Sequence, residues 1–485
     1  MELKTELIKA VGAGYVLDSA DALMPYSSDF SLTPPAYPDY VVRPGNSEDV
    51  QRIISLANKY KTPVVSLSSG VHFYGTTIPK KKGIIVDLRR MDKILDIDEV
   101  NRKVRVEAGV TWGKLQPELR KRGWMVVIPL LPHSSRSVIP DYLEREIPLI
   151  PKYEYAEPLL SMEVIWPNGD IFRTGSASYT GYPKSYGEGA NPQGPGSLDF
   201  FRFLQGAQGT MGVVTWANIK FESIPQIDKA FFIPFDRLDQ AIEPLCRIQR
   251  RKIGNECLLL NNVNLATILS ALRHESFHRV IQDLPRWTCI LILSGLRRRP
   301  NEKIAYEEEA LREIVSEFPG LSLLSMLPGI PELGRDLPET LRNPWPYTEP
   351  YWKHKNQGGC QDIFFITRPQ NAYGFFAAVL DVADRYGFRG EDIGCYLQPI
   401  EYGRGCHLEF NFYYRTDSQE DVAKLRQLYS EAVEILLDKG AFFTRPYGML
   451  SKVVYKRAPS YANTLKQLKN IFDPNHIMCP GNLCF

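Results

Sequence analysis

Residues 62–88 read TPVVSLSSGVHFYGTTIPKKKGIIVDL, and they decide the fold that we expect. The apolar runs PVVSL and GIIVDL predict two buried strands, and a loop of small residues joins them. Small side chains let the backbone NH groups of such a loop approach a phosphate closely. The stretch therefore predicts a cradle for the pyrophosphate of a nucleotide cofactor.

The composition predicts an ordinary soluble globular chain. Its 485 residues are 44% hydrophobic and 24% charged, which leaves room for two or three domains. The formal net charge is +2 and no run of Lys or Arg forms a stripe, so we expect no nucleic-acid partner. The N-terminus lacks the apolar core of a signal peptide, and no window approaches the roughly 20 apolar residues of a membrane span. We therefore expect a cytoplasmic protein with no membrane span.

All eight cysteines lie in the second half of the chain, and no two of them form a CxxC pair. This spacing excludes the common zinc-ribbon and ferredoxin-type clusters. In a cytosolic chain such thiols are expected to be free and buried. We therefore predict no metal site of this kind.

The first region, up to about residue 224, predicts strands mixed with helices. An extended run at 39–44 precedes a helix capped by Ser47, and further strands are expected at 63–70, 83–88, 104–112 and 125–129, with a helix at 112–122. SMEVIWPNGDIFRTG at 161–175 predicts a hairpin that turns at Asn168 and Gly169, because Asn-Gly supplies the positive φ angles of a tight turn. GTMGVVTWANIKF at 209–221 predicts a second hairpin-like element. Residues 179–197, rich in Gly, Pro and Tyr, predict a long loop that is functional or disordered.

The second region, from 225 to about 450, alternates strand-like and helical stretches. Strands are expected at 229–235, 287–296, 362–368 and 406–414, and helices at 236–250, 302–318, 372–386 and 417–439. This alternation predicts a sheet covered by helices on one side. A last helix stops at Asp473 and Pro474, and a nonhelical tail follows.

Six segments in this order resemble the flavoproteins of the vanillyl-alcohol oxidase type, whose FAD-binding domain is also called the PCMH domain. They are PVVSLSSG, GIIVDLRRMDKILDID, VRVEAGVTWGKL, SMEVIWPNGDIFRTG, LQGAQGTMGVVT and FDPNHIMCPG. The resemblance implies an α+β fold, with a PCMH-type domain of two α+β subdomains and a cap domain built on an antiparallel sheet covered by helices. It places an N-terminal segment at 1–34, the FAD-binding domain at 35–224, the substrate-binding cap at 225–450 and a segment returning to the FAD domain at 451–485.

The resemblance implies FAD as cofactor and assigns its contacts to four segments. The residues assigned are Leu67, Ser68, Ser69, Gly70, Val71 and His72 in the first loop, Pro132, Ser134, Ser137 and Val138 in PHSSRSVI, Gly209, Gly212, Val213 and Val214 beside the flavin, and Asn482 in the tail. The chain departs from the family where paired glycines would follow Ser137 and Val138. We therefore expect an altered path through 141–155, which lines the substrate entry or folds against the cap.

His72 lies near the place of the histidine that tethers FAD covalently in several members. Such a bond would raise the reduction potential of the flavin. The alternative is a histidine that lines the adenine or pyrophosphate side without a bond. The sequence leaves both open.

The resemblance places substrate chemistry in the cap, where a base takes the hydroxyl proton while the flavin accepts the hydride. In CHLEFNFYY, alternation puts His407, Glu409 and Asn411 on one face of a strand, which is either a half-solvated face or a pocket wall. Tyr402 lies just before this strand and is a further catalytic candidate.

Arg445 and Tyr447 in GAFFTRPYG resemble the segment that carries a Tyr-Arg pair in phenol-oxidising members. Thr444 stands where the tyrosine would be, so Tyr447 is the candidate to supply the hydroxyl. Arg445 could pair with a substrate carboxylate or stabilise reduced flavin. Cys479, where the family has Asn, is either a thiol near the flavin or a small buried residue.

Histidines elsewhere give weaker signals. GRGCH stands in place of the histidine-rich metal motif of the 2-hydroxy-acid dehydrogenases, so we expect no catalytic metal. His354 is expected to be an exposed loop residue, with a neutral base as the alternative. His274 and His278 have i, i+4 spacing and are expected on the surface of one helix.

The sequence thus predicts an FAD-dependent oxidase or dehydrogenase acting on CH-OH groups, with an aromatic or hydrophobic alcohol as substrate. Two alternatives stay open: a 2-hydroxy-acid dehydrogenase that passes electrons to a protein acceptor, and a flavin-bearing electron-transfer subunit of a larger complex. The partners we consider are the small-molecule substrate and either a second copy of the chain or an electron-acceptor protein.

Overall fold

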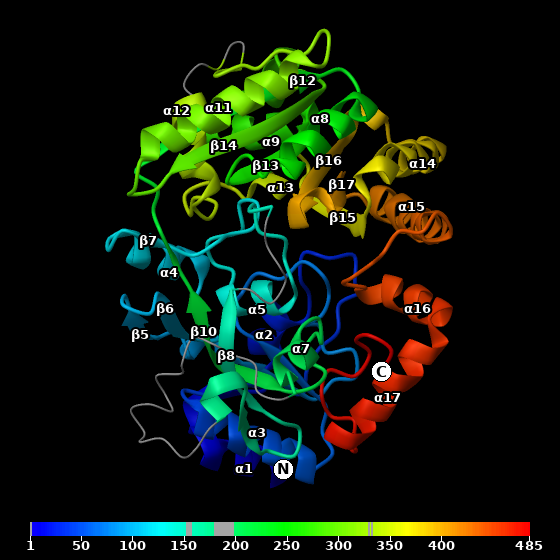
Figure 1. The fold of residues 1–485 in the computed structure, drawn as a ribbon. Coiled ribbons are helices and arrows are strands. Elements are labelled where there is room, and N and C mark those ends of the chain that lie inside the picture. The colour runs from blue at the N-terminus through cyan, green and yellow to red at the C-terminus, as the bar shows by residue number, and fades with distance from the viewer. Residues whose placement is uncertain (1, 152–157, 179–197, 328–329, 331–332) are drawn as a thin grey trace.

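A computed structural model describes residues 2–151, 158–178, 198–327, 330 and 333–485. Two lobes lie one above the other in Figure 1. The lower lobe contains the N-terminal region and the C-terminal helices, and the upper lobe is built on one large sheet. The predicted loop at 179–197 falls outside the described residues.

The stretch 62–88 lies in a four-stranded sheet of the lower lobe with the order β1-β2-β4-β3. These strands are β1 (Val16–Leu17), β2 (Tyr40–Val42), β3 (Val64–Leu67) and β4 (Ile84–Asp87), and only β1 is antiparallel to its neighbour. Helix α3 (Ser47–Lys59) packs apolar residues of one face into the same core as the sheet. Its N-cap is Asn46 rather than the expected Ser47, because the Asn46 side chain accepts a hydrogen bond from the Asp49 amide.

A five-stranded antiparallel sheet forms the rest of this lobe, in the order β5-β6-β10-β8-β9. Its strands are β5 (Ile94–Asp98), β6 (Lys103–Glu107), β8 (Leu159–Ile165), β9 (Ile171–Arg173) and β10 (Val213–Lys220). The hairpin β8–β9 turns at Asn168 and Gly169 as predicted, although of these two residues Gly169 alone has a positive φ, at +91°. The second hairpin-like prediction is wrong, because β10 is one strand that pairs with β6 on one side and β8 on the other.

Short elements complete the lower lobe. The helices are α1 (Glu2–Val11), α2 (Ala20–Leu23), α4 (Trp112–Arg120), α5 (Val138–Leu143) and α7 (Phe200–Leu204). The strand expected at 125–129 is reduced to β7 (Trp124–Met125), which pairs with β11 (Glu222–Ser223).

The upper lobe holds a six-stranded antiparallel sheet with the order β12-β14-β13-β16-β17-β15. The strands are β12 (Ile227–Phe235), β13 (Glu256–Asn261), β14 (Trp287–Gly295), β15 (Gly358–Thr367), β16 (Ile393–Ile400) and β17 (Gly405–Arg415). The predicted strands correspond to β12, β14, β15 and β17. Strands β13 and β16, in the middle of the sheet, were missed.

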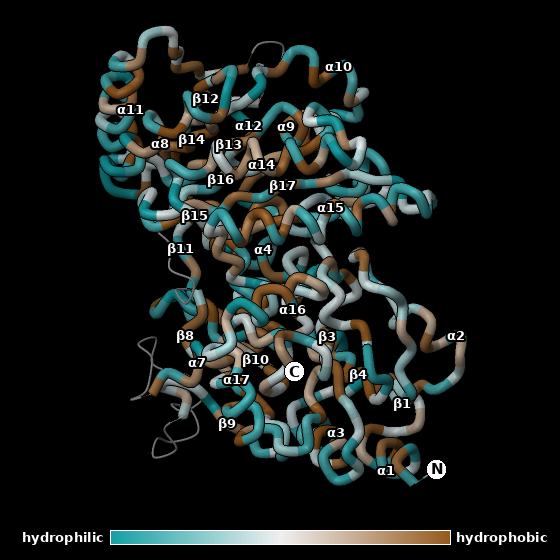
Figure 2. The backbone as a smooth tube through the Cα atoms, turned by 90° about the vertical axis from the view of Figure 1, so that its right-hand side faces the viewer, coloured by the Kyte–Doolittle hydropathy of each residue, from teal (hydrophilic) through white to brown (hydrophobic). Residues whose placement is uncertain are grey.

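Helices cover both faces of this sheet at one end, so the expectation of helices on one side is wrong. One face packs against α8 (Leu238–Arg250), α11 (Pro300–Ser316), α14 (Ala372–Arg385) and α15 (Gln419–Asp438). The other face, over β12, β14 and β13, packs against α9 (Asn262–Arg273), α10 (Phe277–Gln282) and α12 (Leu333–Leu341). Figure 2 shows hydrophobic residues along the strands and a largely hydrophilic α11 at the edge of the lobe.

The chain returns to the lower lobe through α16 (Gly448–Arg457) and α17 (Pro459–Phe472), drawn in red in Figure 1. The tail then lies beside β3. The Val64 amide donates to the Ile477 carbonyl over 2.7 Å, and the Cys479 amide donates to the Val64 carbonyl over 2.7 Å. Thus the last residues of the chain join the edge of the sheet that carries the cradle loop, residues 68–83, which connects β3 to β4.

Candidate cofactor and substrate site

The larger of two adjoining cavities lies in the lower lobe beside the loop that follows β3. Its empty volume is about 1010 Å³. Its walls come from that loop, from α5, from residues 204–214 and from Tyr447. The cavity thus lies beside the loop that the sequence predicts as a cofactor cradle.

The loop after β3 presents backbone donors to this region. Ser68, Ser69 and Gly70 follow the strand directly, and their amides donate no hydrogen bond to other residues that the structure describes. The Ser137 hydroxyl donates to the Ser68 carbonyl over 2.7 Å and holds the loop against the start of α5. Unpaired amides on a loop of small residues form an anion-binding concavity. The residues present therefore fit a pyrophosphate.

Glycine is required on the opposite wall. Gly209 has a φ of +72°, and a Cβ atom there would lie 2.8 Å from the Cys479 sulfur. Burial raises the pKa of the Cys479 thiol to about 11, so the sulfur is protonated at neutral pH. The tail thus closes this wall with a small, uncharged side chain.

His72 lies between the main cavity and a further hollow behind the loop. Its Nε2 atom lies 2.7 Å from the Ser69 carbonyl, so Nε2 carries the proton and Nδ1 does not. Burial lowers the pKa of His72 to about 4. The ring is therefore neutral at physiological pH, with Nδ1 as its basic atom.

The second cavity lies between the lobes and shares Phe73, Tyr74 and Arg136 with the first. Its aromatic walls come from both lobes. The aromatic residues that line it are Phe73, Tyr74, Tyr351, Trp352 and Tyr396. A flat apolar group suits such walls.

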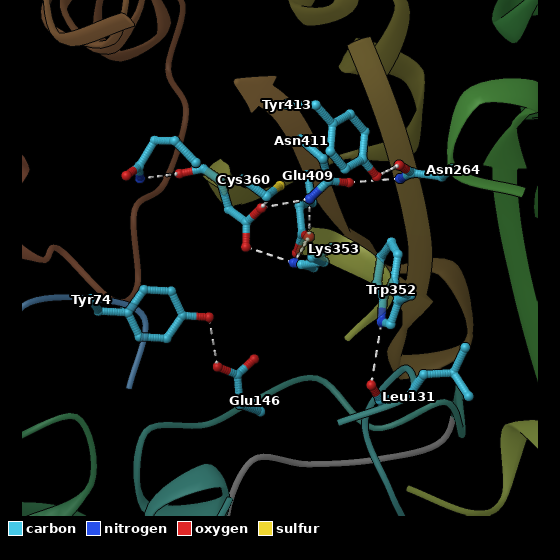
Figure 3. A network of polar contacts seen from close by, with 12 residues as sticks. Tyr74, Leu131, Glu146, Asn264, Trp352, Lys353, Cys360, Glu409, Asn411 and Tyr413 are labelled. Carbon is cyan, nitrogen blue, oxygen red and sulfur yellow. Dashed lines mark hydrogen bonds and ion pairs between the residues drawn. The ribbon is translucent and has the colours of Figure 1, made fainter. Parts of the chain in front are cut away.

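Glu146 is the polar centre on the lower side of this cavity. The Tyr74 hydroxyl donates to it over 3.0 Å (Figure 3), and Arg445 pairs with it at 2.6 Å. Arg136 lies 3.6 Å away and also pairs closely with Asp141. Burial alone would raise the pKa of Glu146, but Arg445 and Arg136 hold it below its usual range. Glu146 therefore stays ionised.

Polar residues of the cap sheet form the upper side (Figure 3). Lys353, in α13 (Trp352–Lys355), donates to Glu409 over 2.7 Å and to Asp362 over 2.6 Å. Asn411 donates to the same two carboxylates. The second oxygen of Glu409 lies 3.0 Å from His407 Nε2. Burial alone would raise the pKa of Glu409, but Lys353 and His407 hold it well below its usual range.

Comparison with known proteins identifies the lower lobe. Residues 38–140 match the family described as "FAD binding domain". Residues 38–140 therefore carry an FAD-binding domain of the PCMH type. FAD as cofactor is thereby confirmed.

Two relatives illustrate the range of this group. A glycolate oxidase subunit of Bacillus subtilis is 27% identical over 256 residues, which are 52% of this chain and 51% of the relative. The 4-cresol dehydrogenase [hydroxylating] flavoprotein subunit of Pseudomonas putida is 30% identical over 176 residues, 35% of this chain and 34% of the relative. The matches thus span about half and a third of these relatives.

The fold as a whole is similar to that of substrate-bound p-cresol methylhydroxylase. The TM-score is 0.86 at 18% identity, over 100% of this chain and 96% of the other. This likeness confirms the expected α+β fold with a cap. In the part of the chain that is described, no helix is long and apolar enough to cross a membrane.

Most residues assigned to FAD surround the first cavity. Those that line it are Leu67, Ser68, Ser69, Val71, His72, Gly209, Gly212 and Val214. Gly70 lines the hollow behind the loop, and Val213 is buried in β10. Asn482 accepts a hydrogen bond from Lys80 and donates to the Thr76 and Gln208 carbonyls, so it joins the tail to two walls.

The residues assigned from PHSSRSVI divide between three places. Pro132 lines the second cavity rather than the first. Ser134 donates to the Trp345 carbonyl of the upper lobe. Ser137 is the N-cap residue of α5, and Val138 is buried in the core beneath it. Of these four residues, Ser137 hydrogen-bonds to the loop after β3, and Arg136 of the same segment lies over the Phe73 ring.

The catalytic candidates do not all meet. His407 and Glu409 line the second cavity, and Tyr447 lines the first, where its hydroxyl donates to Glu144 over 2.9 Å. Arg445 lies behind Glu146. Tyr402 lies outside both cavities, with Lys252 over its ring at 5.0 Å, so we drop it from the catalytic set.

Three other histidine predictions need correction. His354 is not an exposed loop residue: it lies in α13 among Phe30, Phe73 and Tyr351, and burial lowers its pKa to about 4. His274 ends α9 with a φ of +55°, and His278 belongs to α10, so they do not share a helix face. No group of metal-ligating residues is found among the residues that the structure describes.

Several charged or phenolic residues that line the second cavity were not predicted from the sequence, and five of them form the polar network described above. They are Tyr74, Arg136, Glu146, Lys353 and Asp362. Glu146 lies in residues 141–155, the segment for which the sequence predicts a path that differs from that of the family. Lys353 stands beside His354, which drew attention to that segment for a different residue.

Proposed function

We propose that the protein is an FAD-dependent oxidoreductase that oxidises a hydroxylated small molecule with an aromatic or hydrophobic body. The observation that supports it is the pair of adjoining cavities. One fits a dinucleotide, the other has aromatic walls and a His-Glu pair, and both share Phe73, Tyr74 and Arg136. The proposal assigns the cofactor to 35–224 with the tail 451–485, and the substrate to the cap at 225–450.

FAD, when bound, supplies the acceptor for the two electrons of the substrate. His407 is the proposed base. Glu409 is ionised and can only accept a hydrogen bond, so His407 carries its proton on Nε2. This leaves Nδ1 as the nitrogen that takes a hydroxyl proton.

The other residues bind and orient. Tyr351, Trp352 and Tyr396 offer apolar faces to the body of a substrate, and Tyr396 lies beside His407 with ring centroids 5.5 Å apart. Packing of the two lobes around the cavity excludes water, which strengthens each hydrogen bond inside. The cresol in the names of two similar proteins agrees with an aromatic substrate.

Anaerobic mixing tests the proposal. FAD-loaded protein is mixed with benzyl alcohol and 4-hydroxybenzyl alcohol, and loss of flavin absorbance is followed under argon and then under air. We expect bleaching, slowed by about 10²-fold or more in His407→Asn, because a general base contributes about 10²–10⁴-fold. His354→Asn is the matched control, since His354 is a half-buried histidine that does not line the second cavity. A flavin that no alcohol bleaches would contradict the proposal.

A further inference from the structure

The charged side chains around the second cavity are matched within the protein. Lys353 is held by Asp362 and Glu409 at 2.6 and 2.7 Å. On the opposite side, Arg136 is held by Asp141 and Glu146, and Arg445 by Glu146. All of these side chains are at least four-fifths buried.

Negative charge exceeds positive charge in this set. Three cations, Lys353, Arg136 and Arg445, face four carboxylates, Asp141, Glu146, Asp362 and Glu409. Burial raises the pKa of Asp141 to about 6. Protonation of Asp141 in mild acid would therefore leave three negative and three positive charges in this set. Within the described residues, each lysine and arginine of this set therefore already has a carboxylate at ion-pair distance.

We propose that the second cavity selects a substrate without negative charge and rejects 2-hydroxy acids. An incoming carboxylate would lose its hydration and would have to displace Glu146 from its arginines or Asp362 from Lys353. A neutral hydroxylated aromatic molecule meets no such barrier. This inference rests on the proposed function, because it concerns the substrate of the same site.

Glu146 is the residue that determines this specificity. Its Oε1 atom serves Tyr74, Arg136 and Arg445 together. In Glu146→Gln the amide oxygen can still accept the Tyr74 hydrogen bond, but Arg445 loses its ion pair and Arg136 keeps its ion pair with Asp141. That arrangement would bind a substrate carboxylate by charge-assisted hydrogen bonds.

Calorimetry with two matched ligands tests the inference. Mandelate and mandelamide share a phenyl ring and a hydroxyl group, and only mandelate is charged. With FAD-loaded wild-type protein we expect mandelamide to bind at least about tenfold more tightly. Glu146→Gln should raise the affinity for mandelate by about tenfold or more and change that for mandelamide by less than about threefold.

Controls make each outcome decisive. Glu431→Gln removes a carboxylate that pairs with Arg385 far from the cavity and should leave both affinities unchanged. If Glu146→Gln does not fold, Asp362→Asn replaces it, since it frees Lys353 from one of two carboxylates. Equal binding of the two ligands to the wild type, or no gain for mandelate in the variant, overturns the inference. If the wild type binds neither ligand, a gain in mandelate affinity in Glu146→Gln supports the inference, and no gain overturns it.

The two proposals fail separately. Bleaching of the flavin by neutral alcohols together with equal binding of mandelate and mandelamide would leave the proposed function standing and remove this inference. Tighter binding of mandelamide than of mandelate, without bleaching by any alcohol, would support this inference and remove the proposed function.

Discussion

Replacing Lys353 by methionine should destabilise the cap in a pH-dependent way. Lys353 is 14% exposed, and its ammonium group contacts Asp362 and Glu409, which are 8% and 12% exposed. Methionine keeps most of the aliphatic stem and removes the charge. Two buried carboxylates would then face each other, bridged only by the Asn411 amide.

The size of the effect follows from these contacts. Removing one partner of a buried ion pair costs about 3–5 kcal/mol, because the remaining charge is left uncompensated. In the wild type the pKa of Glu409 is lowered, so its stabilising contribution is present above its unfolded pKa and is lost only in strong acid. In Lys353→Met the pKa of Glu409 would rise, and protonation would relieve the repulsion. The cost should therefore be larger at pH 8 than at pH 5.

Urea unfolding followed by tryptophan fluorescence measures this cost. Lys355→Met is the matched control, because Lys355 lies in the same helix and its ammonium group is 3.4 Å from the Ala271 carbonyl rather than beside a carboxylate. We expect the control to change stability by less than about 0.5–1 kcal/mol. Equal costs for the two variants, or the same cost for Lys353→Met at pH 5 and pH 8, would refute the reasoning.

Three further changes probe the cofactor cavity. Gly209→Ala places a Cβ 2.8 Å from the Cys479 sulfur at a φ of +72°. The amount of FAD bound after purification should therefore fall about tenfold, the equivalent of ~1.4 kcal/mol. Gly123→Ala is the control, because Gly123 has a similar φ of +80° but lies in open space, and this variant should retain FAD. The pKa of His72 lies at about 4, so its contribution to stability is complete above pH 6.5 and declines as the pH falls towards 4. Wild-type protein should release FAD in this range, and an identical pH profile for His72→Asn would contradict this cause. Lys469→Met removes a buried donor to the Thr210 and Met478 carbonyls, so amide exchange of the tail should become faster. Unchanged exchange would contradict the proposed role of Lys469 in holding the tail.

Local patterns in the sequence predicted much of the fold. Alternation in CHLEFNFYY predicted β17 and the shared face of His407 and Glu409, because a strand with one face against an apolar core needs apolar residues at every second position. The apolar runs of 62–88 predicted β3 and β4 in the same way. Strand β13, by contrast, was missed: all six residues of ECLLLN are buried, so no alternation marks it.

The charged wall of the second cavity could not be predicted, because it depends on pairings between distant segments. Asp362 meets Lys353 and Asn411 only through the register in which Asp362 opposes Asn411 across β15 and β17. Glu146 meets Arg445 across about 300 residues of sequence. A charged residue in a loop gives no signal of such a partner before the chain is folded. Tyr402 shows the converse, since it stands close to β17 in sequence and lines neither cavity.

The flavin spectrum of the purified chain tests the central claim most directly. The cradle loop, the glycine wall and the adjoining substrate cavity predict one FAD per chain, and anaerobic addition of a neutral aromatic alcohol should bleach it. Precipitation with acid then shows whether the colour stays with the protein, which decides if His72 or another residue holds FAD covalently. A chain that binds no flavin when FAD is supplied in excess would contradict the account.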